Sequence, residues 1–180
     1  MDARDFERVA DLLARWAADD AVGDARRRRS RREELRRRAA EAATLTGVLI
    51  DLCERQTPVV LGTRGRPCAG RIEAVTTGLC ALRDDDGALV LVQLTAVTSL
   101  SADVALTSGE RIPDVELDLV GALGALAAER PEVRLDLAGG AVVTGRLDAV
   151  GTQVATLRFG GLGPGRTRLV VLDAVTACRL

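Results

Sequence analysis

The residues in this chain whose type and spacing most clearly indicate a binding site are the arginines at positions 26–38. Nine Arg and two Glu lie within these thirteen positions and give a net charge of +7. A guanidinium group binds phosphate or carboxylate through paired N–H donors. We therefore take the block as a candidate binding site for a nucleic-acid backbone or an acidic protein. The candidate residues are Arg26, Arg27, Arg28, Arg29, Arg31, Arg32, Arg36, Arg37 and Arg38.

The same block has a second interpretation, as a solvated helix with no ligand. Arg, Glu and Leu all favour helices, so we expect the block to be helical. In a helix, Glu33 would lie beside Arg29 and Arg37, because each pair is four positions apart. Glu34 would lie beside Arg38 for the same reason. Any nucleic-acid contact made by the block would depend on salt and would not read sequence.

Residue types that the chain lacks exclude most catalytic and metal-binding chemistry. It has no His and no Tyr, and all 25 of its basic residues are Arg. Without His there is no usual general base, no Ser–His or Cys–His pair and no His metal ligand. Without Lys there is no Schiff base. We therefore expect a non-enzymatic protein with no metal and no cofactor.

The four cysteines show no metal-binding spacing. Cys53 falls on an apolar helical face, and Cys68, Cys80 and Cys178 fall in strand-like runs. Buried, reduced thiols are the expected result. The longest apolar stretch, 119–128, has ten residues, too few to span a bilayer. With no secretory leader visible, we expect a cytoplasmic protein with no membrane partner.

The chain also repeats itself. Residues 54–83 match residues 129–158 at ten of thirty positions when the chain is shifted by 75. After a three-residue insertion, residues 91–98 match residues 169–176 at six of eight positions. Chance does not produce such matches in register, so one structural unit occurs twice.

Each copy is predicted to contain one helix and five strands. Apolar spacing and turn residues place the first helix at 44–55 and its strands at 59–62, 69–75, 79–83, 88–94 and 97–100. They place the second helix at 114–130, capped by Asp114, and its strands at 133–137, 142–150, 153–159, 167–172 and 175–178. Only two residues separate the last two strands of each copy, which predicts a 3₁₀ turn.

One helix followed by five bent antiparallel strands, with a 3₁₀ turn before the last, is typical of an SH3-type small barrel. The apolar and glycine spacing of each copy resembles the first Sm motif of the Sm/LSm/Hfq superfamily. The residues that carry this resemblance are Val59, Leu61, Gly70, Ile72, Leu79 and Leu82, and Val133, Leu135, Gly145, Leu147, Val154 and Leu157. The whole chain also resembles poorly characterised actinobacterial proteins with an Arg-rich helical start and two such barrels.

The resemblance implies a mainly β fold with a helical N-terminal arm and two tandem Sm-like, five-stranded SH3-type barrels, each preceded by an α-helix. It places the arm at 1–43, the first barrel at 44–101, a linker at 102–113 and the second barrel at 114–180. Within the arm, Phe6, Leu13 and Trp16 lie on one face of a predicted amphipathic helix at 3–17. That helix is a candidate dimerisation element.

The chain departs from the Sm pattern where Sm proteins bind uridine-rich RNA. Those proteins use an Asp and an Asn in one loop and an Arg-Gly pair in another. The corresponding positions here hold Thr76, Cys80, Leu94 and Thr95 in the first copy, and Gly151, Ala155, Leu172 and Asp173 in the second. Between 44 and 180 the only aromatic residue available for base stacking is Phe159. We therefore do not expect the barrels to bind uridine-rich RNA.

The fourth strand of each copy is apolar on both faces, at 88–92 and at 169–172. One face fills a barrel, so the other needs a cover. In Sm-like proteins strand 4 pairs with strand 5 of a neighbour. We therefore expect a non-enzymatic Sm-like assembly protein that self-associates through barrel edge strands, as a homo-oligomer or as an intramolecular barrel pair. The alternative is a nucleic-acid-binding regulator that uses the Arg26–Arg38 helix.

Overall fold

The structure, a computed structural model, describes residues 27–38, 40–104, 106, 111–160 and 166–180. The chain divides into two compact units, 1–42 and 43–180. In the first unit, residues 27–38 and 40–41 are helical and the side chains of 27–38 are exposed. Arg26 and the amphipathic helix expected at 3–17 lie outside the described residues.

The second unit begins with helix α2 (Leu45–Glu54), as the sequence predicts. Thr44 caps it, and the Thr44 hydroxyl accepts a 3.0 Å hydrogen bond from the Gly47 N–H. The apolar positions of α2 recur every three or four residues, so that Val48, Leu49 and Leu52 share one buried face. This face covers strand β2, which places α2 over the first half of the sheet.

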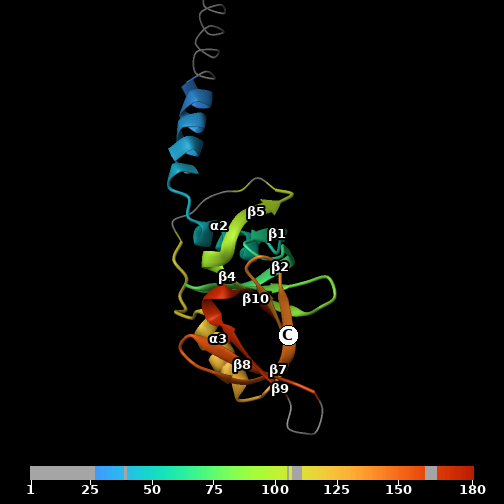
Figure 1. The fold of residues 1–180 in the computed structure, drawn as a ribbon. Helices are drawn as coiled ribbons and strands as arrows, with labels where there is room; N and C mark the ends of the chain where they lie inside the picture. The colour runs from blue at the N-terminus through green and yellow to red at the C-terminus, as the bar shows by residue number, and fades with distance from the viewer. Residues whose placement is uncertain (1–26, 39, 105, 107–110, 161–165) are drawn as a thin grey trace, which may run out of the picture. The chain divides into compact units, whose positions relative to one another are not determined.

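Ten strands follow in two groups of five, and each group has a 3₁₀ turn before its last strand (Figure 1). The first group contains β1 (Pro58–Thr63), β2 (Cys68–Val75), β3 (Leu79–Arg83), β4 (Leu89–Gln93), turn η1 (Leu94–Ala96) and β5 (Val97–Ala102). The second group contains β6 (Glu132–Leu137), β7 (Val142–Val150), β8 (Val154–Phe159), β9 (Arg166–Val171), turn η2 (Leu172–Ala174) and β10 (Val175–Arg179). Every predicted strand and both 3₁₀ turns are present, with ends within two residues of the prediction.

The prediction of two closed five-stranded barrels is wrong. All ten strands form one open antiparallel sheet in the order β5-β1-β2-β3-β4-β10-β6-β7-β8-β9. A separate first barrel would close only if the free edge of β4 returned to its own β5. Instead β4 pairs with β10 of the second group, which opens each group into the other. The fold is mainly β, as expected, but its sheet is continuous.

Within this sheet the two halves keep the same internal order. β5-β1-β2-β3-β4 in the first half corresponds to β10-β6-β7-β8-β9 in the second. The strand registers also correspond, because Leu61 pairs with Leu100 and Leu135 pairs with Cys178 at the same place in the repeat. The internal repeat is therefore visible in the strand pairing as well as in the sequence.

The hydrophobic core has two clusters, and each contains residues from both halves of the sheet. The cluster under the second half includes Leu79, Ala81 and Leu91 from β3 and β4. The cluster under the first half includes Ala177 from β10. β3 and β4 are therefore buried on both faces, which explains why β4 is apolar on both sides.

Helix α3 (Leu119–Ala127) begins later than predicted. Its N-cap is Asp118, whose carboxylate accepts a 2.7 Å hydrogen bond from the Gly121 N–H, and not Asp114. The segment before it accepts hydrogen bonds from the β2–β3 turn through its carbonyl groups. The Gly78 N–H donates to the Leu117 carbonyl oxygen at 3.1 Å. A Cβ at Gly78 would lie 2.8 Å from the Asp118 Cα, so only glycine allows this close approach.

Candidate functional site

The two halves of the sheet meet where β4 pairs with β10, and we call this contact the internal joint. It is short, with three residue pairs, and the Leu180 N–H extends it by a 2.9 Å hydrogen bond to the Leu89 carbonyl oxygen. The pairs are Val92 with Ala177, Leu91 with Cys178, and Val90 with Arg179.

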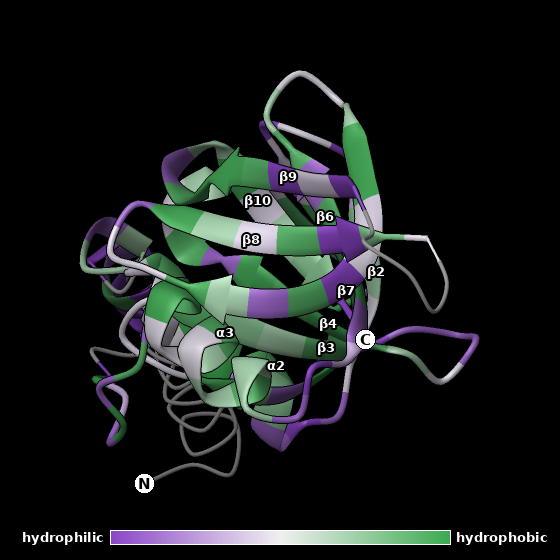
Figure 2. Ribbon diagram, turned by 60° about the horizontal axis from the view of Figure 1, so that its bottom comes forward, coloured by the Kyte–Doolittle hydropathy of each residue, from purple (hydrophilic) through white to green (hydrophobic). Residues whose placement is uncertain are grey.

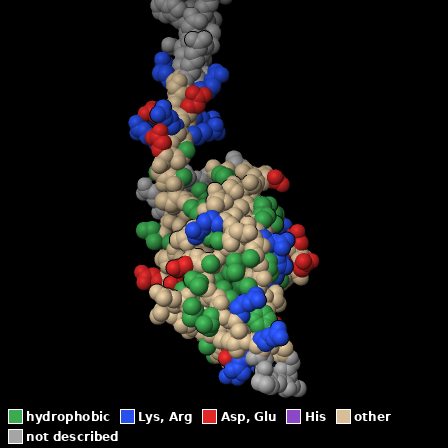
Figure 3. Space-filling model, in the orientation of Figure 1, with side chains coloured by type: hydrophobic (Ala, Val, Ile, Leu, Met, Phe, Trp, Pro, Cys, Tyr) green, Lys and Arg blue, Asp and Glu red, His purple; other side chains and the backbone are tan. Residues whose placement is uncertain are grey.

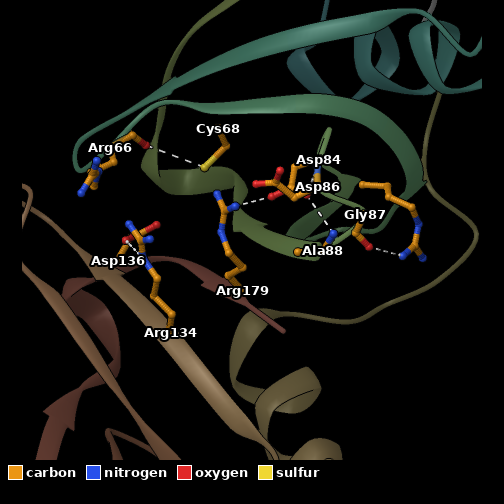
Figure 4. A network of polar contacts seen from close by, with 10 residues as sticks. Arg66, Cys68, Asp84, Asp86, Gly87, Ala88, Arg134, Asp136 and Arg179 are labelled. Carbon is orange, nitrogen blue, oxygen red and sulfur yellow. Dashed lines mark hydrogen bonds and ion pairs between the residues drawn. The ribbon is translucent and has the colours of Figure 1, made fainter.

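A polar network closes one end of the internal joint (Figure 4). Arg179 of β10 donates to Asp84, which follows β3. The other Asp84 oxygen accepts from the Ala88 N–H at 2.8 Å and from the Asp86 N–H at 3.1 Å, which fixes the β3–β4 turn. Only 9% of the Asp84 side chain is exposed. The ion pair therefore ties the end of the second half to a turn of the first.

Thr76 adds a second link between the halves. Its side chain is buried, and its hydroxyl donates a 2.6 Å hydrogen bond to the Leu117 carbonyl oxygen, ahead of α3. The Thr76 hydroxyl oxygen also accepts a 3.1 Å hydrogen bond from the Leu79 N–H. This is the position where the Sm pattern has a base-binding Asp. Thr76 therefore has a structural role here.

The two borders of the sheet are β5 and β9. Among the described residues β5 pairs only with β1. On the same basis β9 pairs only with β8, and Figure 2 shows these two strands side by side. The two strands stand at opposite ends of the strand order. On β9, Leu169 is 66% exposed and Val171 is 54% exposed. Exposed apolar side chains on an edge strand are unusual, because such an edge invites pairing with another strand.

Because the sequence repeats, the two edge strands correspond to the two strands that pair at the internal joint. β9 corresponds to β4, since Leu169 and Leu91 face equivalent residues on β8 and β3. β5 corresponds to β10 by the matched registers described above. Placing the internal register on the outer edges would pair Val170 with Ser99, Leu169 with Leu100, and Arg168 with Ser101. The register of the β4–β10 pair can therefore be transferred to β9 and β5.

Other contacts of the internal joint do not recur at the outer edges. In the β7–β8 turn, Gly151 and Gln153 replace Thr76 and Gly78. Gly151 has no hydroxyl to donate, and the Gln153 side chain would block the close approach that Gly78 allows. A joint between two copies would consequently rest on the strands and on apolar contact, and would be weaker than the internal joint.

Of the nine candidate arginines, the eight at 27–38 lie on the helix of the first unit, and Arg26 falls outside the described residues. On the side of this helix that Figure 3 shows, both basic and acidic side chains project from it. The predicted pair of Glu34 with Arg38 is present at 2.6 Å. Arg37 pairs with Glu41 at 2.8 Å, a contact that is not among the predicted pairs.

The cysteines are free thiols, as expected, and Cys68, Cys80 and Cys178 are buried. Burial raises the pKa of the Cys80 and Cys178 thiols to about 12, because the thiolate would lose its hydration. Burial also raises the pKa of Cys53 and Cys68. These thiols therefore stay protonated at neutral pH and are poor nucleophiles. Within the described part of the chain, no group of three or more Cys, Asp or Glu side chains is arranged to hold a metal ion.

Sequence reasoning identified β9 through its apolar run but missed the Asp84–Arg179 pair. Asp84 looks like an ordinary turn residue, and Arg179 is 95 positions away, so no local pattern links them. Among the described helices, none combines the length and apolar character needed to cross a bilayer. No protein-family model matches the chain, and no curated protein matches it. The Sm resemblance therefore stays a prediction.

Proposed function

We propose that this protein is a non-enzymatic assembly protein that self-associates head to tail, through β9 of one copy and β5 of the next. The observation that carries the proposal is the exposure of Leu169 on an edge strand. Its counterpart in the repeat, Leu91, is 7% exposed because it packs into the hydrophobic cluster under the second half of the sheet. A second copy presenting β5 would cover Leu169.

The chemistry of β9 favours a specific partner over indiscriminate pairing. Its first half carries Arg166 and Arg168, and charged residues on an edge oppose random strand addition. The Arg168 guanidinium lies 5.4 Å from the centre of the Phe159 ring. Its second half is apolar. Only a strand that tolerates arginine at one end and provides an apolar residue beside Leu169 fits this edge, and β5 offers Ser101 and Leu100 at those places.

Because β5 and β9 are different surfaces, the contact is heterologous and leaves one edge of each kind open at the ends. Heterologous contacts give closed rings when the rotation between copies closes, and filaments when it does not. The assembly would form in the cytoplasm, a location supported by the four free cysteines. The absence of His, Lys and Tyr from the sequence supports a role without catalysis.

The test is the mass of the full chain in solution, measured by size-exclusion chromatography with light scattering over a range of concentrations. We expect oligomers for the native chain and a shift towards monomer for Leu169→Glu. Losing a buried leucine costs about 1.5–3 kcal/mol, or about tenfold or more in the dissociation constant. The matched control is Val142→Glu, since Val142 is 37% exposed on β7, which is not an edge strand.

A monomer at every concentration would contradict the proposal. So would oligomers that Leu169→Glu leaves unchanged, because these would form through another surface, such as residues 3–17. A mixing experiment tests the head-to-tail geometry. Leu169→Glu blocks β9 and Ser101→Arg weakens β5, so their mixture retains one good edge of each kind. We expect the mixture to associate more strongly than either variant alone, whereas symmetric pairing would give no gain on mixing.

A further inference from the structure

The acidic residues of the helix in the first unit gather on one side. In a helix of 3.6 residues per turn, positions 28, 32 and 36 fall along one stripe, and position 31 lies next to it. Glu33, Glu34 and Glu41 centre on the opposite side, where the pairs of Glu34 with Arg38 and Glu41 with Arg37 form. We call the surface made by Arg28, Arg31, Arg32 and Arg36 the acid-free face, because Glu33 and Glu34 lie only at its borders, three positions from Arg36 and Arg31.

Arg32 shows the separation most clearly. The helical neighbours three and four positions away from it are Arg28, Arg29, Leu35 and Arg36, and none of them is acidic. The side chains of this face are exposed within the helix 27–38. Like charges at this spacing repel and weaken a helix. A cationic stripe of this kind is therefore unfavourable unless an anionic partner meets it.

We propose that the acid-free face binds the phosphodiester backbone of a nucleic-acid duplex without reading its sequence. Arg28, Arg32 and Arg36 recur about every 6 Å along the helix axis, since each residue rises about 1.5 Å. A row of guanidinium groups at this interval meets successive phosphates, each of which takes two parallel N–H donors. The proposal thus narrows the candidate binding site from the nine arginines of the block to four residues on one face of the helix.

The composition of the face favours a duplex over other anionic partners. Protein interfaces rely on buried aromatic or apolar anchors, and the only apolar side chain in the stripe is Leu35. Single-stranded nucleic acids are held by stacking on aromatic rings, and residues 27–38 contain none. A phosphate backbone requires neither, because charge and counterion release supply its affinity.

The proposal does not depend on pairing between β9 and β5. The experiment is therefore run in the Leu169→Glu background as well as in the native chain, so that assembly and duplex binding succeed or fail separately. If both proposals hold, each added copy contributes one more cationic helix, and native oligomers bind long duplexes more tightly than short ones.

The measurement is fluorescence anisotropy of a short mixed-sequence DNA duplex at a series of salt concentrations. The test variant is Arg32→Gln with Arg36→Gln, and the matched control is Arg37→Gln with Arg38→Gln. Each variant removes two positive charges and substitutes the same residue in the same helix. We expect the test variant to bind more weakly and to lower the slope of log K against log salt by about two, because each lost phosphate contact removes about 0.9.

We expect the control variant to lose much less affinity, since Arg37 and Arg38 are held by glutamates. Equal losses in the two variants would overturn the proposal, because net charge alone would then explain binding. Absence of duplex binding at low salt would also overturn it. Binding to vesicles of anionic phospholipid, or to single strands, in preference to the duplex would assign the face to a different partner. Far-ultraviolet circular dichroism checks that both variants keep the same helix content.

Discussion

Leu91 and Leu169 occupy the same place in the two halves of the sheet, yet 7% of Leu91 is exposed against 66% of Leu169. Each faces the equivalent residue on its neighbouring strand, Ala81 for Leu91 and Thr156 for Leu169. The two strands differ in what lies beyond them: β10 lies beside β4, and Leu91 packs into the cluster under the second half, while no strand among the described residues lies beyond β9. The internal joint is thus a template for a contact that a single chain cannot complete.

The register of that outer contact can be tested at Ser101, an exposed residue of β5. The internal register places it opposite Arg168 of the next copy. Ser101→Glu should strengthen self-association, because opposite charges across a strand pair contribute about 0.2–1 kcal/mol, and Ser101→Arg should weaken it by a similar amount. Sedimentation velocity of the two variants measures both effects. Equal responses to the two charges would show that Arg168 does not lie opposite.

The ion pair between Asp84 and Arg179 should contribute strongly to stability. Asp84→Ala removes the carboxylate that accepts from Arg179 and from two backbone N–H groups of the β3–β4 turn. We expect a loss of about 2 kcal/mol in the free energy of unfolding, measured in urea, since hydrogen bonds to charged groups contribute at this level. Asp85→Ala, at the exposed neighbouring position, should change stability little. A cost equal to that of Asp85→Ala would contradict the structural role of the pair.

Two glycine substitutions should act in opposite directions. Gly78→Ala should destabilise the protein by about 1–3 kcal/mol, because the new Cβ would lie 2.8 Å from the Asp118 Cα and would press the segment before α3 away from the turn. Gly124→Ala should stabilise it by about 1 kcal/mol, because alanine favours helices and a Cβ there meets no atom within 4 Å. Thermal unfolding followed by circular dichroism compares them. A stabilising Gly78→Ala would exclude the close contact with α3.

The stability of the protein should fall steeply above pH 9. Burial raises the pKa of Cys80 and Cys178 from 9.0 to about 12, so the unfolded chain loses these protons while the folded chain keeps them. The stabilisation is complete below pH 9 and is lost as pH rises towards 12, at about 1.4 kcal/mol per pH unit for each thiol. The chain has no Lys or Tyr to titrate in this range. Urea unfolding between pH 8 and pH 11 measures the slope.

The control for this experiment is the double variant Cys80→Ala with Cys178→Ala. Its absolute stability should be lower, because two buried side chains are shortened, but its dependence on alkaline pH should be flatter. The slope therefore separates the titration of the thiols from their contribution to packing. An unchanged slope in the double variant would assign the pH dependence to other groups.

The sequence predicted the elements well because their causes are local. Turn residues such as Asp86-Gly87 and Gly139-Gly140 mark the strand ends, and both glycine turns adopt the positive φ angles that glycine favours. The joining of ten strands into one sheet could not be read in this way. It depends on whether β4 meets β5 or β10, and the two strands differ little in local pattern.

The start of α3 shows the same limit on a smaller scale. Asp114 and Asp118 are both acceptable N-caps, and the sequence around Asp114 suits a first helical turn. The helix is capped at Asp118 because Thr76 and Gly78, about forty positions earlier, donate hydrogen bonds to the Leu117 carbonyl oxygen. The same limit applies to the candidate site. The apolar run of β9 could be predicted from the sequence, but its exposure could not, because exposure depends on which strand lies beside it.

Because β4 and β10 belong to the same polypeptide, their pairing affects how a larger assembly could grow. Two strands of one polypeptide meet at an effective concentration that dilution cannot lower, so every chain brings one seam that is already closed. A closed ring built from these chains needs half as many association steps as a ring of the same size built from separate five-stranded units. It must also contain an even number of units, whereas separate units could close with an odd number.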